Sequence, residues 1–434
     1  MVVEFTTEAS ELDVFIFGNS NVLMIASTIG ENCLEMPKNF LFARRHALWL
    51  GLGTCATLIA LHKAKDVSHN LKILALDDPS RDFTVSQGGS LKERAAAKGI
   101  TYGAAGRYPD FVLNPNITAC YARECALLVP EWSLKWFIEW YPKWPVPNHP
   151  LRPSPDSFDF TAADWMAKFA QTHNLLLRGH PLIWQVSLPP WFKEAVNRQN
   201  AEKFMVEHIQ RVAGHYAGKM HSWDVVNEAI NIYEGHPDAL QTSPWLEFLG
   251  SDYIELAYRV AAQADPNALL VYNDFGLEYD DADSDKKRAA VLKLLEHLKS
   301  KGTPIDALGI QAHLFGSATS SYKKLRKFIS DVACLGLQIM ITELDVIDEE
   351  LPSDITVRDR IIAGVYEDFL SAALDEPAVK TIITWELSDG YTYHTDFHPR
   401  SDSMPVRPLP LDADLKPKLA WNAIVRAFDS APSR

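Results

Sequence analysis

Eight apolar, strand-like segments recur along this chain of 434 residues, and each is separated from the next by about the length of one helix with its connections. Each segment is rich in β-branched or aromatic residues, which is typical of strands buried on both faces. Strands that alternate with amphipathic helices predict a parallel sheet, and eight such units predict one closed (β/α)8 barrel of the TIM type. The predicted strands lie in Gly99–Ala105, Cys125–Trp132, Leu175–Trp184, Met220–Ala229, Leu269–Phe275, Ile305–Leu314, Leu337–Val346 and Lys380–Asp389.

Polar and aromatic residues gather at the C-terminal ends of these segments, the end at which such a barrel forms its active site. Two of them, Glu228 and Glu343, follow apolar runs that would direct both into one cleft. A pair of carboxyl groups suits glycoside hydrolysis, in which one protonates the leaving oxygen and the other attacks the sugar or activates water. The alternative for each is a salt bridge at the rim. The set is Glu131, His180, Asn227, Glu228, Asn273, Asp274, Gln311, His313, Glu343, Asp345 and Trp385.

Histidine and aromatic residues accompany the two glutamates. His180 ends one segment and Trp184 follows four residues later, and an indole face can stack on a sugar ring. Gln311 and His313 alternate with apolar neighbours, so a strand would place both on one face. We expect His313 to hydrogen-bond a carboxylate and hold it ionised. A metal-dependent hydrolase that uses His180, His313 and Asp345 is an alternative from another class, although no compact metal-ligand motif is present.

Composition narrows the range of partners. The formal net charge of −14 argues against binding nucleic acid through its phosphates and fits a neutral substrate. We therefore expect a polysaccharide or oligosaccharide substrate and no obligate protein partner. Cys120 and Cys125 could pair, but buried free thiols are the preferred interpretation, and no cysteine pair has the spacing of a metal site.

The first ninety residues do not have the pattern of the barrel. Arg44 and Arg45 precede an apolar run from Ala47 to Leu61, which is short for a membrane span but suits a twin-arginine export signal. A buried helix and an uncleaved membrane anchor are the alternatives. We expect an extension over residues 1–62 with the signal or anchor at Arg44–Leu61, a linker over 63–89 and the barrel over 90–430. Export to the periplasm or the cell exterior would follow.

Several motifs together resemble glycosyl hydrolase family 10, the endo-β-1,4-xylanase family, over roughly residues 90–428. Residues 90–103 (SLKERAAAKGITYG) are similar to the opening helix and first strand of the family, and residues 178–184 (RGHPLIW) resemble its third-strand motif. Residues 223–228 (WDVVNE) resemble the acid/base motif, and residues 341–345 (ITELD) resemble the nucleophile motif. The stretch 412–420 is similar to the closing turn and helix. The resemblance implies a TIM barrel that hydrolyses xylan with retention of configuration.

The resemblance also implies roles for particular residues. Glu228 would be the acid/base, Glu343 the nucleophile, and Asn227 a contact to the sugar 2-hydroxyl. Glu131 would bind in the glycone subsites. No cofactor and no metal would be needed. The remaining substrate-binding or carboxylate-tuning residues would be Lys135, His180, Trp184, Gln311, His313 and Trp385.

Five positions depart from the pattern of the family. Trp132 replaces an asparagine that usually binds xylose, and Gln185 replaces a histidine. Phe275 and Gly276 stand where tyrosine and asparagine are usual, and Tyr393 replaces a tryptophan. We expect a glycone side that is narrower or more apolar than in a typical xylanase. Another β-glycoside as substrate, such as a β-glucan or a glycosylated small molecule, stays open, as does a catalytically silent carbohydrate-binding barrel.

Overall fold

The computed structural model describes residues 72–73, 75–86, 88–138 and 149–434, together with the backbone of three short strands near the N-terminus. The chain divides into two units, Met1–Lys72 and Ile73–Arg434. In the first unit, β1 (Val2–Thr7) and β3 (Met24–Ile25) both pair antiparallel with β2 (Ser10–Phe15). The predicted signal at Arg44–Leu61 lies outside the described residues. Within those residues, no helix combines the length and apolar character that crossing a membrane requires.

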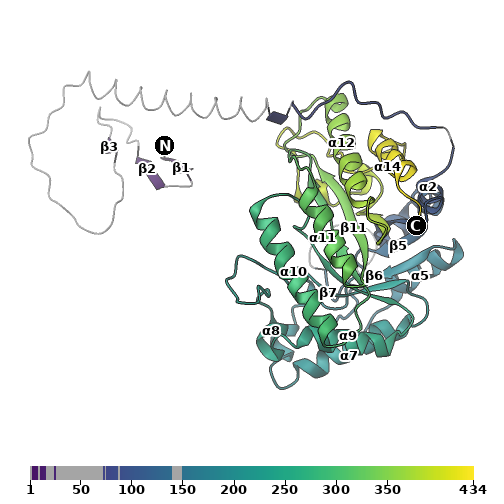
Figure 1. Ribbon diagram of the computed structural model, residues 1–434. Helices are drawn as coiled ribbons and strands as arrows, with labels where there is room; N and C mark the ends of the chain where they lie inside the picture. Colours follow the sequence, from purple (N-terminus) through teal and green to yellow (C-terminus); the bar gives the residue numbers. More distant parts are fainter. Residues whose placement is uncertain are drawn as a thin grey trace, which may run out of the picture. The chain divides into compact units, whose positions relative to one another are not determined.

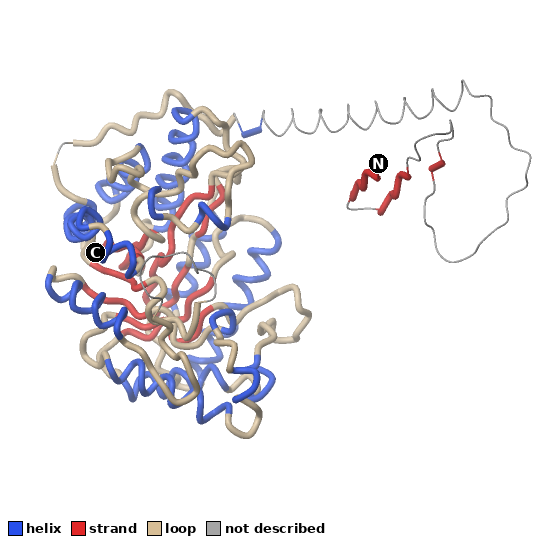
Figure 2. The backbone as a smooth tube through the Cα atoms, turned by 180° about the vertical axis from the view of Figure 1, so that it is seen from behind, coloured by secondary structure: helices blue, strands red, loops and turns tan. Residues whose placement is uncertain are grey.

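The second unit is a closed parallel barrel, as the eight segments predict. Neighbouring strands pair in chain order, β12 pairs with β4, and β11 pairs with β9, so the sheet closes on itself. Figure 2 shows these strands gathered inside a shell of helices. The barrel strands are β4 (Thr101–Gly106), β5 (Leu127–Pro130), β6 (Leu176–Gly179), β7 (Ser222–Asn227), β8 (Leu269–Asp274), β9 (Ala307–Ile310), β11 (Gln338–Ile347) and β12 (Val379–Thr384).

Six of the eight barrel strands end earlier than their predicted segments, and two of these ends change the path of several residues of interest. The strand β6 ends at Gly179, so His180 and Trp184 belong to the loop that follows. The strand β9 ends at Ile310, and the chain resumes as β10 (His313–Phe315) after Ala312, whose φ is +62°. The predicted strand through Gln311 and His313 is therefore interrupted, because a left-handed residue breaks the alternation of a strand.

Helices cover the outside of the barrel, and Figure 1 shows α10, α11 and α12 side by side there. Side-chain caps fix the starts of two helices. Asp281 accepts hydrogen bonds from the backbone amides of Asp283 and Ser284 at α10, and Asp354 accepts from those of Thr356 and Val357 at α12. The helices are α2 (Leu91–Ala96), α3 (Tyr108–Leu113), α4 (Pro115–Glu124), α5 (Thr161–Thr172), α6 (Phe192–Ala195), α7 (Ala201–His215), α8 (Pro244–Leu249), α9 (Tyr253–Ala264), α10 (Ala282–Ser300), α11 (Lys323–Cys334), α12 (Ile355–Ala373), α13 (His394–Phe397) and α14 (Leu419–Ser430), with 3₁₀ turns η1 (Gln185–Ser187) and η2 (Asp389–Tyr391).

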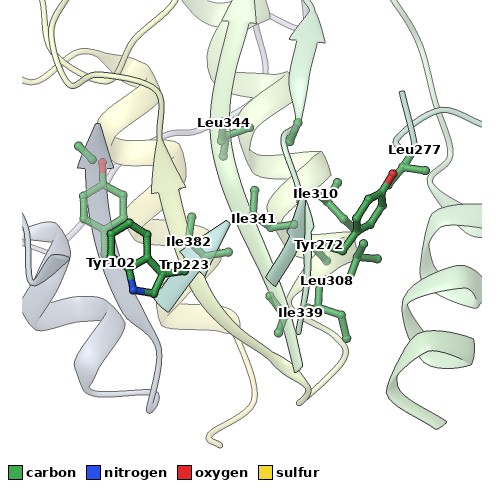
Figure 3. Packing of buried hydrophobic residues seen from close by; sticks show 14 of the residues in the cluster. Tyr102, Trp223, Tyr272, Leu277, Leu308, Ile310, Ile339, Ile341, Leu344 and Ile382 are labelled. Carbon is green, nitrogen blue, oxygen red and sulfur yellow. The ribbon is translucent and has the colours of Figure 1, made fainter. Parts of the chain in front are cut away.

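The core lies around and between the strands, and Figure 3 shows part of it with Ile341, Ile382 and Trp223. The Trp223 indole lies against the backbone of Gly179, where an added Cβ would be 1.9 Å from the ring. Only glycine fits at that position of β6. This packing fixes β6 against β7, and so it fixes the loop that carries His180.

The chain enters and leaves the barrel along its helices. Ile73 and Phe83 are buried, and Arg81 pairs with Glu367 and Asp368 on α12, so the described part of the predicted linker packs against the barrel. At the other end, the Arg434 amide donates to the Lys98 carbonyl at 3.0 Å, and Figure 1 places the C-terminus beside α2. Cys120 and Cys125 are buried free thiols.

Candidate active site

One cleft at the C-terminal end of the barrel collects all ten residues that the sequence nominates as catalytic or substrate-binding. It encloses about 930 Å³ of space, including the part that opens to solvent. The ten come from six of the eight strands or the loops after them, so the barrel itself brings them together. The nominated residues in its lining are Glu131, Lys135, His180, Trp184, Asn227, Glu228, Gln311, His313, Glu343 and Trp385.

Glu228 follows the last residue of β7 and has a φ of +57°, a left-handed conformation that turns its side chain out of the strand pattern. Three donors hold its carboxyl group: Trp184 Nε1 at 2.8 Å, Gln311 Nε2 at 2.8 Å and Asn227 Nδ2 at 3.0 Å. Burial raises the pKa of Glu228, and the charge of Glu343 acts in the same direction, although the Gln311 hydrogen bond opposes them.

Glu343 lies within β11 and has a different environment. Asn273 Nδ2 donates to its Oε1 at 2.7 Å, His313 Nε2 lies 3.3 Å from its Oε2, and His180 Nδ1 lies 4.0 Å from Oε1. Burial would raise the pKa of Glu343, but the charges of His180, His313 and Lys135 outweigh it and hold the pKa below its usual value. The two glutamates therefore have pKa values displaced in opposite directions, which is how paired carboxyl groups take on separate acid and nucleophile roles.

A line of amides connects the two glutamates. Asn273 Nδ2 also donates to Asn227 Oδ1 at 2.9 Å, and Thr342 Oγ1 donates to Asn273 Oδ1 at 2.7 Å. The Thr342 hydroxyl fixes the orientation of the Asn273 amide, which in turn fixes the orientation of Asn227. Asn227 keeps its amide nitrogen directed at Glu228. Sequence analysis placed Asn273 at a strand end but assigned it no role.

His313 is held from its other side by a buried carboxylate. Its Nδ1 lies 2.9 Å from Asp345 Oδ2, and His394 Nε2 lies 2.8 Å from the same oxygen. Burial opposes protonation of His313, but Asp345 and Glu343 outweigh it and raise the pKa of His313 well above its usual value. Burial likewise opposes ionisation of Asp345, yet the two histidines lower its pKa to about 2. His313 therefore lies within hydrogen-bond distance of two carboxyl groups, Asp345 and Glu343, as expected for a residue that holds a carboxylate ionised.

The metal alternative requires His180 to join His313 and Asp345. Among the residues that the structure describes, the group whose donor atoms converge within 4.8 Å is His313, Asp345 and His394. His180 lies outside that group, because its Nδ1 pairs with Asp224 Oδ2 at 2.9 Å. Asp345 Oδ2 lies at hydrogen-bond distance from both histidines, so the three side chains contact one another directly.

Lys135 lies close to two indoles that line the same cleft. Its ammonium is 5.0 Å from the Trp184 ring centroid and 5.6 Å from that of Trp385, distances at which a cation is attracted to the ring. Burial lowers the pKa of Lys135, while Glu131, Glu343 and Glu228 oppose that effect. Burial also raises the pKa of Glu131, against the charges of Arg107 and Lys135.

Three of the five residues that depart from the family pattern have defined contacts or conformations. Gln185 Nε2 donates to the Glu228 carbonyl at 3.2 Å, so this side chain supports the backbone of the acid candidate. Phe275 is 45% exposed, and the Lys287 ammonium lies 3.7 Å from its ring centroid. Gly276 has a φ of +72°, a conformation that glycine adopts without strain. Trp132 and Tyr393 both line the cleft.

The sequence did not nominate Glu386 or Arg107. Glu386 directly follows Trp385, and Arg107 directly follows β4, so a charged residue just after a strand end was the available signal. Trp191 does not line the cleft, although it belongs to the loop that follows Trp184. Its indole donates to the Arg152 carbonyl at 3.1 Å and packs beside Trp136, so it supports the core under the loop.

Comparisons with known proteins agree on the family. The sequence profile of glycosyl hydrolase family 10 matches residues 90–427. The chain is similar to endo-1,4-beta-xylanase C of Paenibacillus barcinonensis, at 34% identity over 306 residues, which cover 63% of this chain and 27% of that protein. It is also similar to endo-1,4-beta-xylanase 5 of Pyricularia oryzae, at 30% identity over 338 residues, which cover 77% of each protein.

Solved structures give the same result for the fold. Xylanase 10B of Thermotoga petrophila RKU-1, solved in complex with xylobiose, superposes with a TM-score of 0.69 at 30% identity and covers 80% of this chain and 99% of its own. The native xylanase 10B of Thermotoga maritima superposes with a TM-score of 0.69 at 30% identity and covers 78% of this chain and 98% of its own.

Proposed function

This chain belongs to glycosyl hydrolase family 10, and from that membership we propose that it is a retaining endo-1,4-β-xylanase that cleaves internal bonds of xylan. Glu343 is the nucleophile and Glu228 is the acid/base. The observation that carries these roles is that the two buried carboxyl groups share one cleft but have different partners. An imidazole nitrogen lies 3.3 Å from Glu343, whereas Glu228 accepts from neutral donors, and the pKa values of the two groups are displaced in opposite directions accordingly.

In the first step, Glu343 Oε attacks the anomeric carbon as an ionised carboxylate, and Glu228 gives its proton to the leaving oxygen. The C–O bond to the aglycone breaks while a glycosyl–Glu343 ester forms. The His313–Asp345 pair favours the ionised form of Glu343, and burial favours the protonated form of Glu228.

The second step uses the same residues with the proton moving in reverse. Once Glu343 is esterified, its negative charge no longer raises the pKa of Glu228. The pKa of Glu228 falls, and its carboxylate can then take a proton from the water that attacks the anomeric carbon. That water releases the sugar with its configuration retained and restores the Glu343 carboxylate.

The other lining residues bind the chain of sugars. Asn227 contacts the 2-hydroxyl at the cleavage site, and its orientation is supported by the Asn273 bond. Lys135, His180, Gln311 and His313 offer polar contacts, and Trp184 and Trp385 offer aromatic faces. Glu131 binds on the glycone side.

The test is a substrate screen with the full-length protein on xylan, mixed-linkage β-glucan, mannan and aryl β-glycosides. We expect release of xylo-oligosaccharides of mixed lengths from xylan, and little product from mannan. A β-glucan as the main substrate is the second candidate, and Trp132 favours it, because this residue stands where a xylose-binding asparagine is usual. A preference for β-glucan over xylan would replace the first proposal by the second.

We also propose that the chain is exported by a twin-arginine signal or held by it as an anchor. The support is the pair Arg44 and Arg45 before the apolar run from Ala47 to Leu61. The full-length protein with both arginines changed to lysine should stay in the cytoplasm of a bacterial host, whereas the unchanged chain should leave it. Equal distribution of the two would contradict export by this route.

A further inference from the structure

Glu386 has a backbone conformation that costs free energy. Its φ is +72°, in the left-handed region that glycine adopts freely and that other L-residues rarely adopt. Its side chain is only 2% exposed, so a carboxyl group is also buried at this point. A strained residue near an active site persists when the surrounding contacts hold it there, and those contacts indicate what it does.

The carboxyl group of Glu386 joins two segments that are distant in the sequence. Its Oε2 accepts a hydrogen bond from the Tyr393 amide at 3.0 Å, and its Oε1 lies 3.3 Å from Arg107 Nη1. Arg107 is buried and also pairs with Asp110 Oδ2 at 2.8 Å and with the Tyr391 carbonyl. The loop after β12 is thereby tied to the start of α3.

Each of the two partners of Glu386, Arg107 and Tyr393, connects it to an aromatic side chain of the cleft. The guanidinium carbon of Arg107 lies 5.1 Å from the ring centroid of Trp132. The Tyr393 hydroxyl lies 3.4 Å from His313 Nδ1. Trp132 and Tyr393 both line the cleft, so one buried carboxyl group braces two aromatic walls. We refer to Arg107, Trp132, Glu386 and Tyr393 together as the glycone wall.

We propose that Glu386 is a positioning residue for substrate selection. Through Arg107 it fixes the Trp132 indole, and through the Tyr393 amide it fixes the second aromatic wall, so that the cleft beyond the first glycone sugar stays narrow. The proposal rests on the proposed xylanase function, because it assigns the glycone wall to the second sugar on that side. It predicts that the glycone wall limits the binding of a second xylose.

The test compares two aryl substrates on the full-length protein. The nitrophenyl β-xyloside places one sugar on the glycone side, and the nitrophenyl β-xylobioside places two. In both Glu386→Gly and Glu386→Ala, the ratio of kcat/KM for the xylobioside to that for the xyloside should rise roughly threefold to tenfold, the size of one aromatic contact.

Melting temperatures separate the change in substrate selectivity from the relief of backbone strain at position 386. Glycine at position 386 removes the backbone strain and alanine keeps it, so the melting temperature of Glu386→Ala should lie below that of Glu386→Gly. Ser403→Gly is the matched control, since Ser403 is exposed and has a φ of +59°. This control relieves similar strain outside the cleft and should leave the selectivity ratio at the wild-type value.

A double-mutant cycle shows whether Glu386 acts through the indole. In a Trp132→Ala background, Glu386→Gly should change the ratio by a clearly smaller factor than it does in the wild-type background, because one of the two side chains that it positions is already gone. An unchanged or reduced ratio in both Glu386 variants would overturn the proposal, and so would a full-sized shift that persists without Trp132. If the wild-type protein hydrolysed neither xyloside, the proposed xylanase function would fail instead, and this inference with it.

Discussion

The centre of the cleft and the glycone wall hold their side chains in different ways. In the centre, Glu228 and Glu343 receive hydrogen bonds from short amides at the ends of neighbouring strands, and Asn273 links the two sides. In the glycone wall, a strained Glu386 and a buried Arg107 brace aromatic rings. The centre is held by several short hydrogen bonds from neutral donors, whereas the wall is held by one ion pair and one backbone hydrogen bond.

The difference indicates where this chain can vary without losing its chemistry. Apart from Trp184 in the loop after β6, the donors to the two glutamates come from strand ends or the residues just after them, so the barrel sets most of the geometry of this pair. The departures at Trp132 and Tyr393 fall in the glycone wall. Changes there should alter which sugar binds, and changes in the centre should alter whether any bond is cleaved.

The largest effect is expected for Glu343→Ala. Without the nucleophile no glycosyl-enzyme forms, so turnover should fall by about 10⁴-fold or more, as for other covalent catalysts that lose the attacking residue. Rapid-quench mass measurement with an activated dinitrophenyl xylobioside should detect no added sugar on the protein. A sugar adduct on this variant would assign the nucleophile to another residue.

Glu228→Ala should lower turnover of xylan by about 10² to 10⁴-fold, because the leaving oxygen receives no proton. The dinitrophenyl leaving group needs little protonation, so this variant should form the glycosyl-enzyme and then stall. Azide should restore turnover and yield a β-glycosyl azide, measured by chromatography. If azide acted on Glu228→Ala and Glu343→Ala alike, the assignment of the two roles would be wrong.

Trp132→Asn should change specificity more than chemistry. The asparagine offers both a donor and an acceptor where the indole offers one donor, so activity on xylo-oligosaccharides should rise by up to about tenfold, the worth of one or two hydrogen bonds. Steady-state kinetics on xylotriose and xylotetraose measure the change. A fast wild-type enzyme that Trp132→Asn only weakens would make the indole a working part of the xylose site.

His313→Ala should move only one limb of the pH profile. Activity requires ionised Glu343, so the acid limb falls as the pH drops through its lowered pKa; it also requires protonated Glu228, so the alkaline limb falls as the pH rises through its raised pKa. Removing His313 takes away a charge that lowers the pKa of Glu343, so the acid limb should shift to higher pH. The measurement is kcat/KM on an aryl xylobioside from about pH 3 to pH 9. An acid limb that stayed in place would mean that His313 does not tune Glu343.

The sequence predicted the barrel and the chemical centre because both follow from local patterns. Apolar runs with polar ends placed Glu228, Gln311 and Glu343 on separate strands, and closure of the barrel brought them together. The break at Ala312 was not predictable, because a left-handed alanine is stabilised by contacts and not by propensity. The role of Glu386 also escaped sequence analysis, because its partner Arg107 lies at the opposite end of the barrel sequence.

The central claim is a double displacement with Glu343 as nucleophile and Glu228 as acid/base. Proton NMR of the first product from a β-linked xylo-oligosaccharide tests it most directly, since the anomeric signals appear before mutarotation mixes them. The account predicts that the β-anomer forms first. An initial α-anomer would contradict it, because a single displacement by water inverts the configuration and needs no covalent intermediate on Glu343.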